Sequence, residues 1–288
     1  YIDLLLSGIT VGSLYALIAI GYTMVYGILR LINFAHGDIF MMSGFFMIYV
    51  SATLPMAVSI PVVLLMTVLL GVLIERAAYK PLRSAPRMSV MISAIGVSYL
   101  LQNLATYITG GLARPYPEIS FLKKSFAIGS LNIKIITLLT PVLTILLVIA
   151  LVIFIKHTKT GMAMRAVSKD FDTARLMGIK VNSVITVTFI IGSFLAGVGS
   201  ILYFTNYGQV SPTIGAMPGL KAFVAAVFGG IGSIPGAVIG AFIIGICENL
   251  LKGMKLTAFS DAFTFALLIV ILVVKPTGLF GEKLTEKV

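Results

Sequence analysis

The chain has 288 residues, of which 59% are hydrophobic and 11% are charged, and its formal net charge is +11. Charged residues make up about 25% of a typical soluble domain, so this chain has too few to give a globule of its size a hydrated surface. The composition therefore excludes an ordinary soluble enzyme. The Lys and Arg residues lie between apolar runs, which favours contact with anionic lipid headgroups over contact with nucleic acid.

Long apolar runs recur along the chain, and about 20 such residues cross a hydrocarbon layer of about 30 Å. The runs are continuous rather than alternating, which favours helices over a barrel. We expect eight spans, at about residues 2–29, 39–54, 57–74, 88–109, 135–155, 182–204, 237–251 and 259–274. The segment 220–230 is too short to cross alone and is predicted to be a half-helix or re-entrant segment. The prediction is an all-α polytopic membrane protein, with residues 1–288 as a single transmembrane domain.

The basic loops indicate how the chain is oriented in the membrane. Residues 75–87 contain Arg76, Lys80, Arg83 and Arg87, and this density predicts a cytoplasmic loop. Alternation of the spans then places residues 110–134 outside and residues 156–181 in the cytoplasm. If the short segment 220–230 counts as a crossing, the basic C-terminal tail is cytoplasmic; if it does not, the tail is outside.

The most polar stretch of the chain is residues 156–181. Thr160 suits the start of a helix, and Gly178 suits the position just after its end. Two faces follow from helical spacing, an apolar one with Met164, Val167, Phe171 and Ala174 and a polar one with Arg165, Ser168, Asp172 and Arg175. The pattern predicts one amphipathic helix at about 160–178 on the membrane surface. Such a helix either anchors to lipid or docks another protein.

Three groups of polar or glycine residues are candidates for a pathway through the membrane. Asn33, His36 and Asp38 form either a hydrated cytoplasmic turn, with Asp38 capping the next helix, or a buried gating element. Polar side chains also interrupt later spans, namely Gln102, Asn103, Asn206, Glu248 and Asn249, with Glu248 expected near the interface. The glycine-rich run either presents its backbone to a ligand or forms a tight turn, and its candidates are Gly229, Gly230, Gly232, Ser233 and Gly236.

The sequence contains no G-x-x-x-x-G-K-[ST] motif, and it shows no catalytic set or metal-ligand spacing. We therefore expect no enzyme activity, no catalytic residue, no metal and no cofactor in this chain. The energy for any transport has to come from a partner or from a gradient, or the flux is passive.

Several stretches resemble the branched-chain amino acid permease family of ABC importers: ALIAIGYTMVYGILRLINFAHGD, ERAAYKPLRSAP, AFVAAVFGGIGSIPGAVIGAFIIG and KPTGLFG. The chain is most similar to the first of the two paired permeases of the leucine, isoleucine and valine importers. It departs from the Glu-Ala-Ala pattern of other importers, because Ser168-Lys169-Asp170 stands in that place. The coupling segment is therefore assigned from its position and its two faces.

The resemblance implies an ABC importer permease fold in the inner or plasma membrane of a bacterium. Besides membrane lipid it implies three kinds of partner, and no nucleic acid: a second related permease, two ATP-binding subunits that hold ATP and magnesium, and a periplasmic or extracellular amino-acid-binding protein. The residues expected to couple the permease to the ATP-binding subunits are Met164, Arg165, Phe171, Arg175, Leu176 and Gly178. The alternatives are a permease of the same family for urea or short amides, a stand-alone gradient-driven carrier, and a channel.

Overall fold

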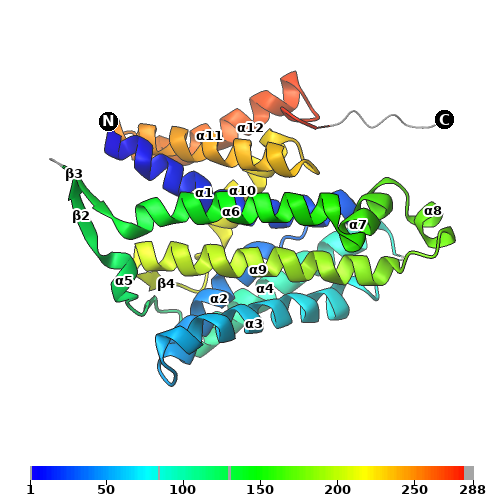
Figure 1. Ribbon diagram of the computed structural model, residues 1–288, viewed down its shortest axis with the longest axis horizontal. Coiled ribbons are helices and arrows are strands. Elements are labelled where there is room, and N and C mark those ends of the chain that lie inside the picture. Colours follow the sequence, from blue (N-terminus) through cyan, green and yellow to red (C-terminus); the bar gives the residue numbers. More distant parts are fainter. Residues whose placement is uncertain (1, 84, 129–130, 282–288) are drawn as a thin grey trace.

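The computed structural model describes residues 2–83, 85–128 and 131–281. Its long helices run side by side along one direction and form a single bundle (Figure 1). Among the described residues, seven helical segments are long and apolar enough to cross a membrane. They are built on α1 (Ile2–Leu29), α3 (Met56–Ile74), α4 (Arg87–Thr109), α6 (Ile135–His157), α9 (Val181–Tyr207), α11 (Ile234–Gly253) and α12 (Ser260–Val274). The chain is a multi-pass helical membrane protein, as its apolar runs predict.

The second predicted span is wrong, because α2 (His36–Ser51) has only 16 residues. At 1.5 Å a residue it is about 24 Å long, less than the hydrocarbon layer it would have to cross. Most of its residues are buried, and it packs against α9, α3, α10 and α4. The described chain therefore has seven long helices and two short ones at membrane depth, rather than eight spans and one short segment.

The second short helix is α10 (Ala216–Gly229), with 14 residues, and it confirms the predicted half-helix. Its first turn meets the first turn of α2 at glycines, since a methyl group on Gly37 would lie 2.7 Å from the carbonyl oxygen of Gly215. From this meeting point α2 leads toward β4 (Gln209–Val210), while α10 leads toward the end of α1, where Gly27 approaches Gly232. The two short helices thus leave the middle of the bundle in opposite directions.

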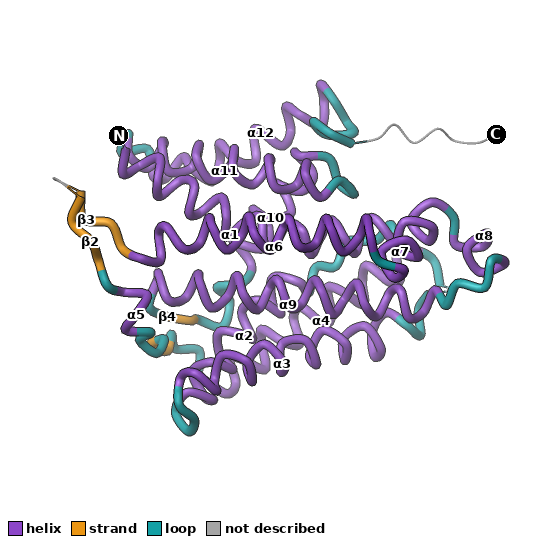
Figure 2. Tube along the Cα trace, viewed as in Figure 1, coloured by secondary structure: helices purple, strands orange, loops and turns teal. Residues whose placement is uncertain are grey.

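The two ends of the bundle differ in structure. At the end where α1 begins, β1 (Arg114–Pro115) pairs with β4 (Gln209–Val210), β2 (Ser125–Ile128) pairs with β3 (Leu131–Lys134), and α5 (Ser120–Lys123) forms one short turn (Figure 2). The opposite end carries α7 (Lys159–Lys169) and α8 (Phe171–Leu176), together with the π-helical turn η1 (Glu75–Tyr79) that continues α3. Both predicted cytoplasmic loops therefore lie at one end of the molecule.

The start of the C-terminal tail lies at the same end as α7. A short 3₁₀ turn, η2 (Thr257–Phe259), leads into α12, which returns the chain to that end (Figure 1). The amides of Leu279 and Phe280 then donate to the carbonyls of Phe228 and Gly229 at 3.0 and 2.9 Å. Residues up to 281 therefore share the side of the predicted cytoplasmic loops, and residues 282–288 of the predicted tail lie outside the described residues.

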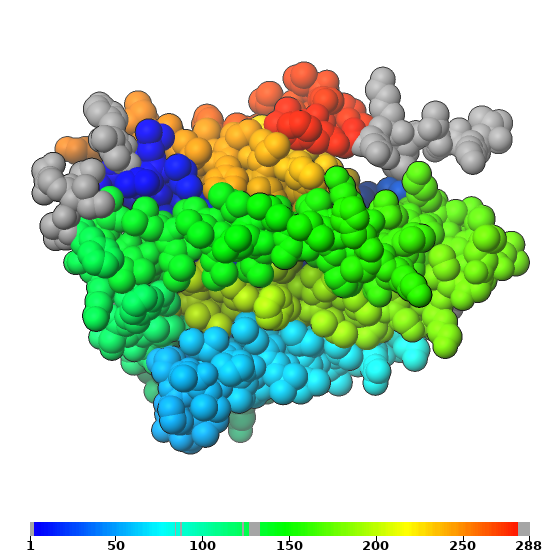
Figure 3. All heavy atoms as spheres, in the orientation of Figure 1, coloured from blue at the N-terminus to red at the C-terminus, as the bar shows by residue number. Residues whose placement is uncertain are grey.

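Small residues bring the central helix α1 close to α11. A methyl group on Gly8 would lie 2.8 Å from the Cα atom of Ile246, and one on Gly12 would lie 2.8 Å from the Cα atom of Phe242. Lipid gives little hydrophobic drive for helix association, so close packing of this kind supplies it. The outer helices α3, α6 and α12 carry exposed apolar side chains, and α6 covers the middle of one face (Figure 3).

Candidate functional site

A cavity of about 340 Å³ lies where the first turns of α2 and α10 meet. Its walls also include α1 and α4, and they divide into three kinds. The polar wall is Asp38, Ser98 and Gln102; the apolar wall includes Phe34, Ile95, Leu220 and Phe223; and the backbone is approachable at Gly37, Gly215 and Gly219. A volume above about 300 Å³ with few polar groups is typical of a small-molecule site.

Asp38 is the charged group of this cavity, and its side chain is buried, with the residue only 2% exposed. The amide of Gln102 donates to its Oδ1 atom at 3.0 Å, and the hydroxyl of Ser98 donates to its Oδ2 atom. Helix α2 begins two residues earlier, at His36, and no side chain caps it. The interpretation of Asp38 as a helix cap is therefore wrong, and its carboxylate instead joins α2 to α4.

Asn33 and His36 lie beside the cavity rather than in it. Both side chains are buried, so the hydrated cytoplasmic turn predicted for residues 33–38 is wrong. The hydroxyl of Tyr79 donates to Oδ1 of Asn33 at 2.8 Å, which holds this turn against η1. The His36 ring packs edge-on against Tyr22, whose own ring lines the cavity, with centroids 5.0 Å apart. These two residues support the cavity wall from behind.

The remaining candidate pathway residues lie away from the cavity. Asn103 is exposed on α4 and donates to the carbonyl of Tyr99 in its own helix at 2.7 Å. The glycine run makes a tight turn between α10 and α11, at the end of the bundle that carries α7. Its members are Gly229, Gly230, Gly232, Ser233 and Gly236; the hydroxyl of Ser233 caps α11, and Gly230 and Gly232 have φ values of 110° and 97°. Of the ten candidates, Asp38 and Gln102 are the two that line this cavity.

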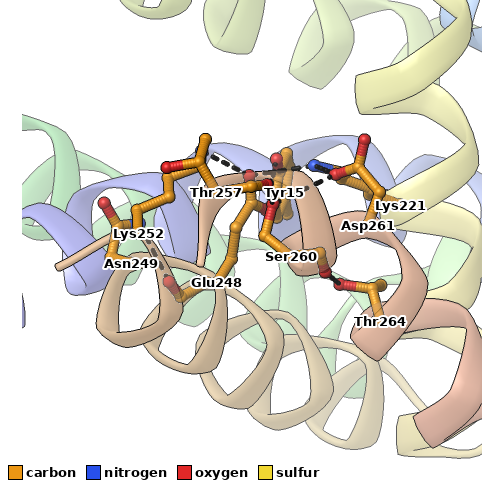
Figure 4. Close-up of polar contacts among 10 residues, drawn as sticks. Tyr15, Lys221, Glu248, Asn249, Lys252, Thr257, Ser260, Asp261 and Thr264 are labelled. Carbon is orange, nitrogen blue, oxygen red and sulfur yellow. Dashed lines mark hydrogen bonds and ion pairs between the residues drawn. The ribbon is translucent and has the colours of Figure 1, made fainter. Parts of the chain in front are cut away.

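A buried ion-pair network joins α10 to α11 and α12. The sequence does not predict this network, because its residues lie within apolar segments. Lys221 of α10 lies 2.9 Å from Glu248 of α11 and 2.6 Å from Asp261 of α12 (Figure 4). Glu248 also accepts from Lys252 at 2.6 Å and from the hydroxyl of Tyr15 at 2.9 Å. The side chain of Glu248 is 2% exposed, so this network is buried within the bundle, and the position of Glu248 near the membrane interface stays a prediction. In the sequence, Lys221 itself indicates such a network, because a lone cation in an apolar helix requires a partner of opposite charge.

The predicted amphipathic helix is two helices, because Asp170 adopts an extended conformation and ends α7. Thr158, not Thr160, caps α7, and its hydroxyl accepts from the amide of Gly161 at 3.0 Å. Asp170 caps α8 by accepting from two amides, at 2.9 and 3.1 Å. The prediction for Gly178 is confirmed: its φ is +80°, and the amides of Gly178 and Ile179 close a Schellman motif on Arg175 and Ala174.

The six predicted coupling residues fall into two groups. Met164 is buried and Phe171 is half-buried, and both pack against the hydrophobic core. The other four, Arg165, Arg175, Leu176 and Gly178, are exposed. The tip of α8 is apolar, with Leu176 88% exposed and Met177 beside it 79% exposed. Helix α7 is tied to the end of α1, because the guanidinium of Arg30 donates to the carbonyl of Ser168 at 3.1 Å.

Among the described residues, no group of three His, Cys, Asp or Glu side chains is placed to hold a metal ion. Seven long helices, two short helices that meet at depth and a cavity at their meeting point define a membrane transport protein, because transporters build substrate sites from such discontinuous helices. The family described as branched-chain amino acid transport system / permease component matches residues 4–272. The chain belongs to this family.

Full-length relatives agree with this assignment. The chain is 41% identical to the high-affinity branched-chain amino acid transport system permease protein LivH of Escherichia coli K12, over 100% of this chain and 98% of that one. It is 39% identical to the corresponding protein BraD of Pseudomonas aeruginosa, with the same coverage. It is also 26% identical to the ribose import permease protein RbsC of Haemophilus influenzae, over 98% of this chain and 88% of that one.

Proposed function

We propose that this chain is a permease subunit of an ATP-driven importer and that it moves leucine, isoleucine and valine across the bacterial cell membrane. The cavity between α2 and α10 carries the proposal, together with the full-length similarity to LivH and BraD. Its apolar and polar walls suit a small molecule with an aliphatic side chain and a charged end. The ribose permease relative supports the view that this fold accepts other cargoes, so the lining residues matter.

The cavity is open at the surface of this chain, which supports a partner across from it. Tyr99 on its rim is 63% exposed, and Ile95 and Leu220 are each 41% exposed. A polar cavity that opened to lipid would be costly, because lipid offers no hydrogen-bond partner to a polar ligand or to water inside it. In this proposal the second, related permease covers the opening, and the amino acid passes between the two chains after a soluble binding protein delivers it.

The tip of α8 is the proposed contact with the ATP-binding subunits, which hold ATP and magnesium. The exposed side chains of Leu176 and Met177 fit an apolar cleft, and Asp172 and Arg175 beside them set the orientation of docking. The contact between Arg30 and Ser168 supports transmission of a movement of α7 to α1. Helix α1 in turn contributes Tyr22 to the cavity wall.

The test is transport by the assembled complex in proteoliposomes. We expect uptake of labelled leucine that requires the binding protein outside and ATP at the ATP-binding subunits, with isoleucine and valine as competitors and urea without effect. Competition by urea or short amides, without competition by isoleucine and valine, would show that the transported substrate is a urea-like compound. Uptake that continues without ATP would support a carrier or channel, and no uptake by the full complex would refute the proposal.

A further inference from the structure

Three carboxylates are buried in the described part of the chain, and they are paired differently. Glu75 is bound by the guanidinium of Arg83, and Glu248 is bound by Lys221 and Lys252. Asp38 is as buried as Glu248, at 2% exposure, but its described partners are the neutral groups of Ser98 and Gln102. Asp38 is thus the buried acid whose charge no described Lys or Arg offsets, and it is also the one that lines the cavity.

We propose that the Asp38 carboxylate is the subsite for the α-ammonium group of the transported amino acid, an inference that rests on the proposed function. A buried charge is costly unless it is paired, and a cationic ligand in the cavity would offset that cost. A carboxylate has about four lone-pair sites, and Gln102 and Ser98 occupy one on each oxygen. The remaining sites suit an ammonium group, which is compact and has three donors.

The rest of the cavity complements the rest of an amino acid. The first turn of α10 borders the cavity at Ala216, and the positive end of its helix dipole favours a carboxylate there, whereas the first turn of α2 already carries the carboxylate of Asp38. The rings of Phe34 and Phe223 and the side chain of Ile95 provide an apolar wall for the aliphatic part. The ligand class assigned to the site is a free α-amino acid with an apolar side chain, held at both charged ends.

The substitution Asp38→Asn distinguishes binding of an ammonium group by Asp38 from a purely structural role of Asp38. Asn at position 38 keeps one amide oxygen to accept a hydrogen bond from α4, but it loses the negative charge. If Asp38 only fastened α2 to α4, Asp38→Asn would change the binding of every ligand to the same extent. If Asp38 binds an ammonium group, Asp38→Asn acts on ligands that carry one.

The experiment measures binding to the complete complex in nanodiscs, without the binding protein, for three probes. These are leucine, 3-methylbutylamine, which lacks the carboxylate, and 4-methylpentanoate, which lacks the ammonium group. We expect Asp38→Asn to weaken the binding of leucine and 3-methylbutylamine about tenfold or more, the effect of losing one charge-assisted hydrogen bond. Binding of 4-methylpentanoate should not weaken, because its carboxylate loses a neighbour of the same charge. Asp38→Glu keeps the charge and should keep the preference for leucine over 4-methylpentanoate.

The matched control is Asp3→Asn, the same change at an exposed residue in the first turn of α1, which should bind all three probes like wild type. Equal weakening of all three probes by Asp38→Asn, or leucine binding as tight as in Asp3→Asn, would overturn the inference. ATPase stimulation by the loaded binding protein confirms that each variant is assembled. If wild type neither binds nor transports leucine, the proposed function itself fails, which is a separate result.

Discussion

The substitution Lys221→Met tests the ion-pair network that fastens α10. It removes the ammonium group that bridges Glu248 and Asp261 and keeps an unbranched side chain of similar length. Lys221 and Glu248 are 8% and 2% exposed, so their attraction is little screened by solvent. Asp261 is 47% exposed, and its pairing contributes at most about 1 kcal/mol.

The loss of stability expected from Lys221→Met depends on the partners that Glu248 keeps. Removal of one partner of a buried ion pair costs about 3–5 kcal/mol, because the other charge is left uncompensated. Glu248 keeps Lys252 at 2.6 Å, so we expect the lower end, about 3 kcal/mol. For a chain of this size this loss corresponds to a melting temperature lower by roughly 6–12 °C.

The assay is thermal unfolding of the purified chain in detergent, followed by circular dichroism of the helices. The double variant Lys221→Met/Glu248→Gln removes both charges while Gln still accepts from Tyr15, so it should recover most of the loss. Lys134→Met, at an exposed lysine, is the control and should melt like wild type. A single variant as stable as wild type, or a double variant less stable than the single one, would refute the reasoning.

Three further predictions concern α8 and the packing of α1. Asp170→Ala removes the cap of α8 and should cost about 1 kcal/mol, seen as faster amide exchange in residues 171–178; unchanged exchange would contradict the assigned cap. Leu176→Asp puts a charge on the proposed docking tip and should reduce co-purification of the ATP-binding subunits at least about tenfold; full recovery of the complex would place docking elsewhere. Gly8→Leu forces α1 away from α11 and should lower the free energy of unfolding by about 1–3 kcal/mol. The control Gly96→Leu, at a position where nothing lies within 4 Å, should leave it unchanged. Equal effects of the two substitutions would show that the close approach of α1 to α11 is unimportant for stability.

Features that depend on a few neighbouring residues could be predicted from the sequence. Gly178 was identified as the residue after a helix because the required left-handed conformation is local. The shortness of the segment 220–230 predicts the half-helix α10. The cap of α7 was assigned to Thr160 instead of Thr158 because two threonines lie within one turn and either type can cap.

The features that could not be predicted depend on contacts between distant segments. Asp38 meets Ser98 and Gln102 only because α2 starts at depth and packs on α4. The sequence leaves open whether the turn of Asp38 is hydrated or buried, and it does not identify these two partners. Lys221 and Glu248 are separated by 27 residues and pair because α10 and α11 fold back on each other. The segment 39–54 is expected to cross the membrane because it is almost wholly apolar, but α2 begins at His36 and its 16 residues are too few for a crossing.

The glycine contact between α2 and α10 divides the transport region into two mechanical units. On one side, the ion pairs of Lys221 with Glu248 and Asp261 join α10 to α11 and α12. On the other side, the hydrogen bonds of Asp38 join α2 to α4. Between them, the backbone of Gly37 lies against the backbones of Gly215 and Gly219, with the side chains of Met41 and Tyr22 beside the contact. We therefore expect α2 and α10 to shift relative to each other at this backbone contact when the membrane barrier opens.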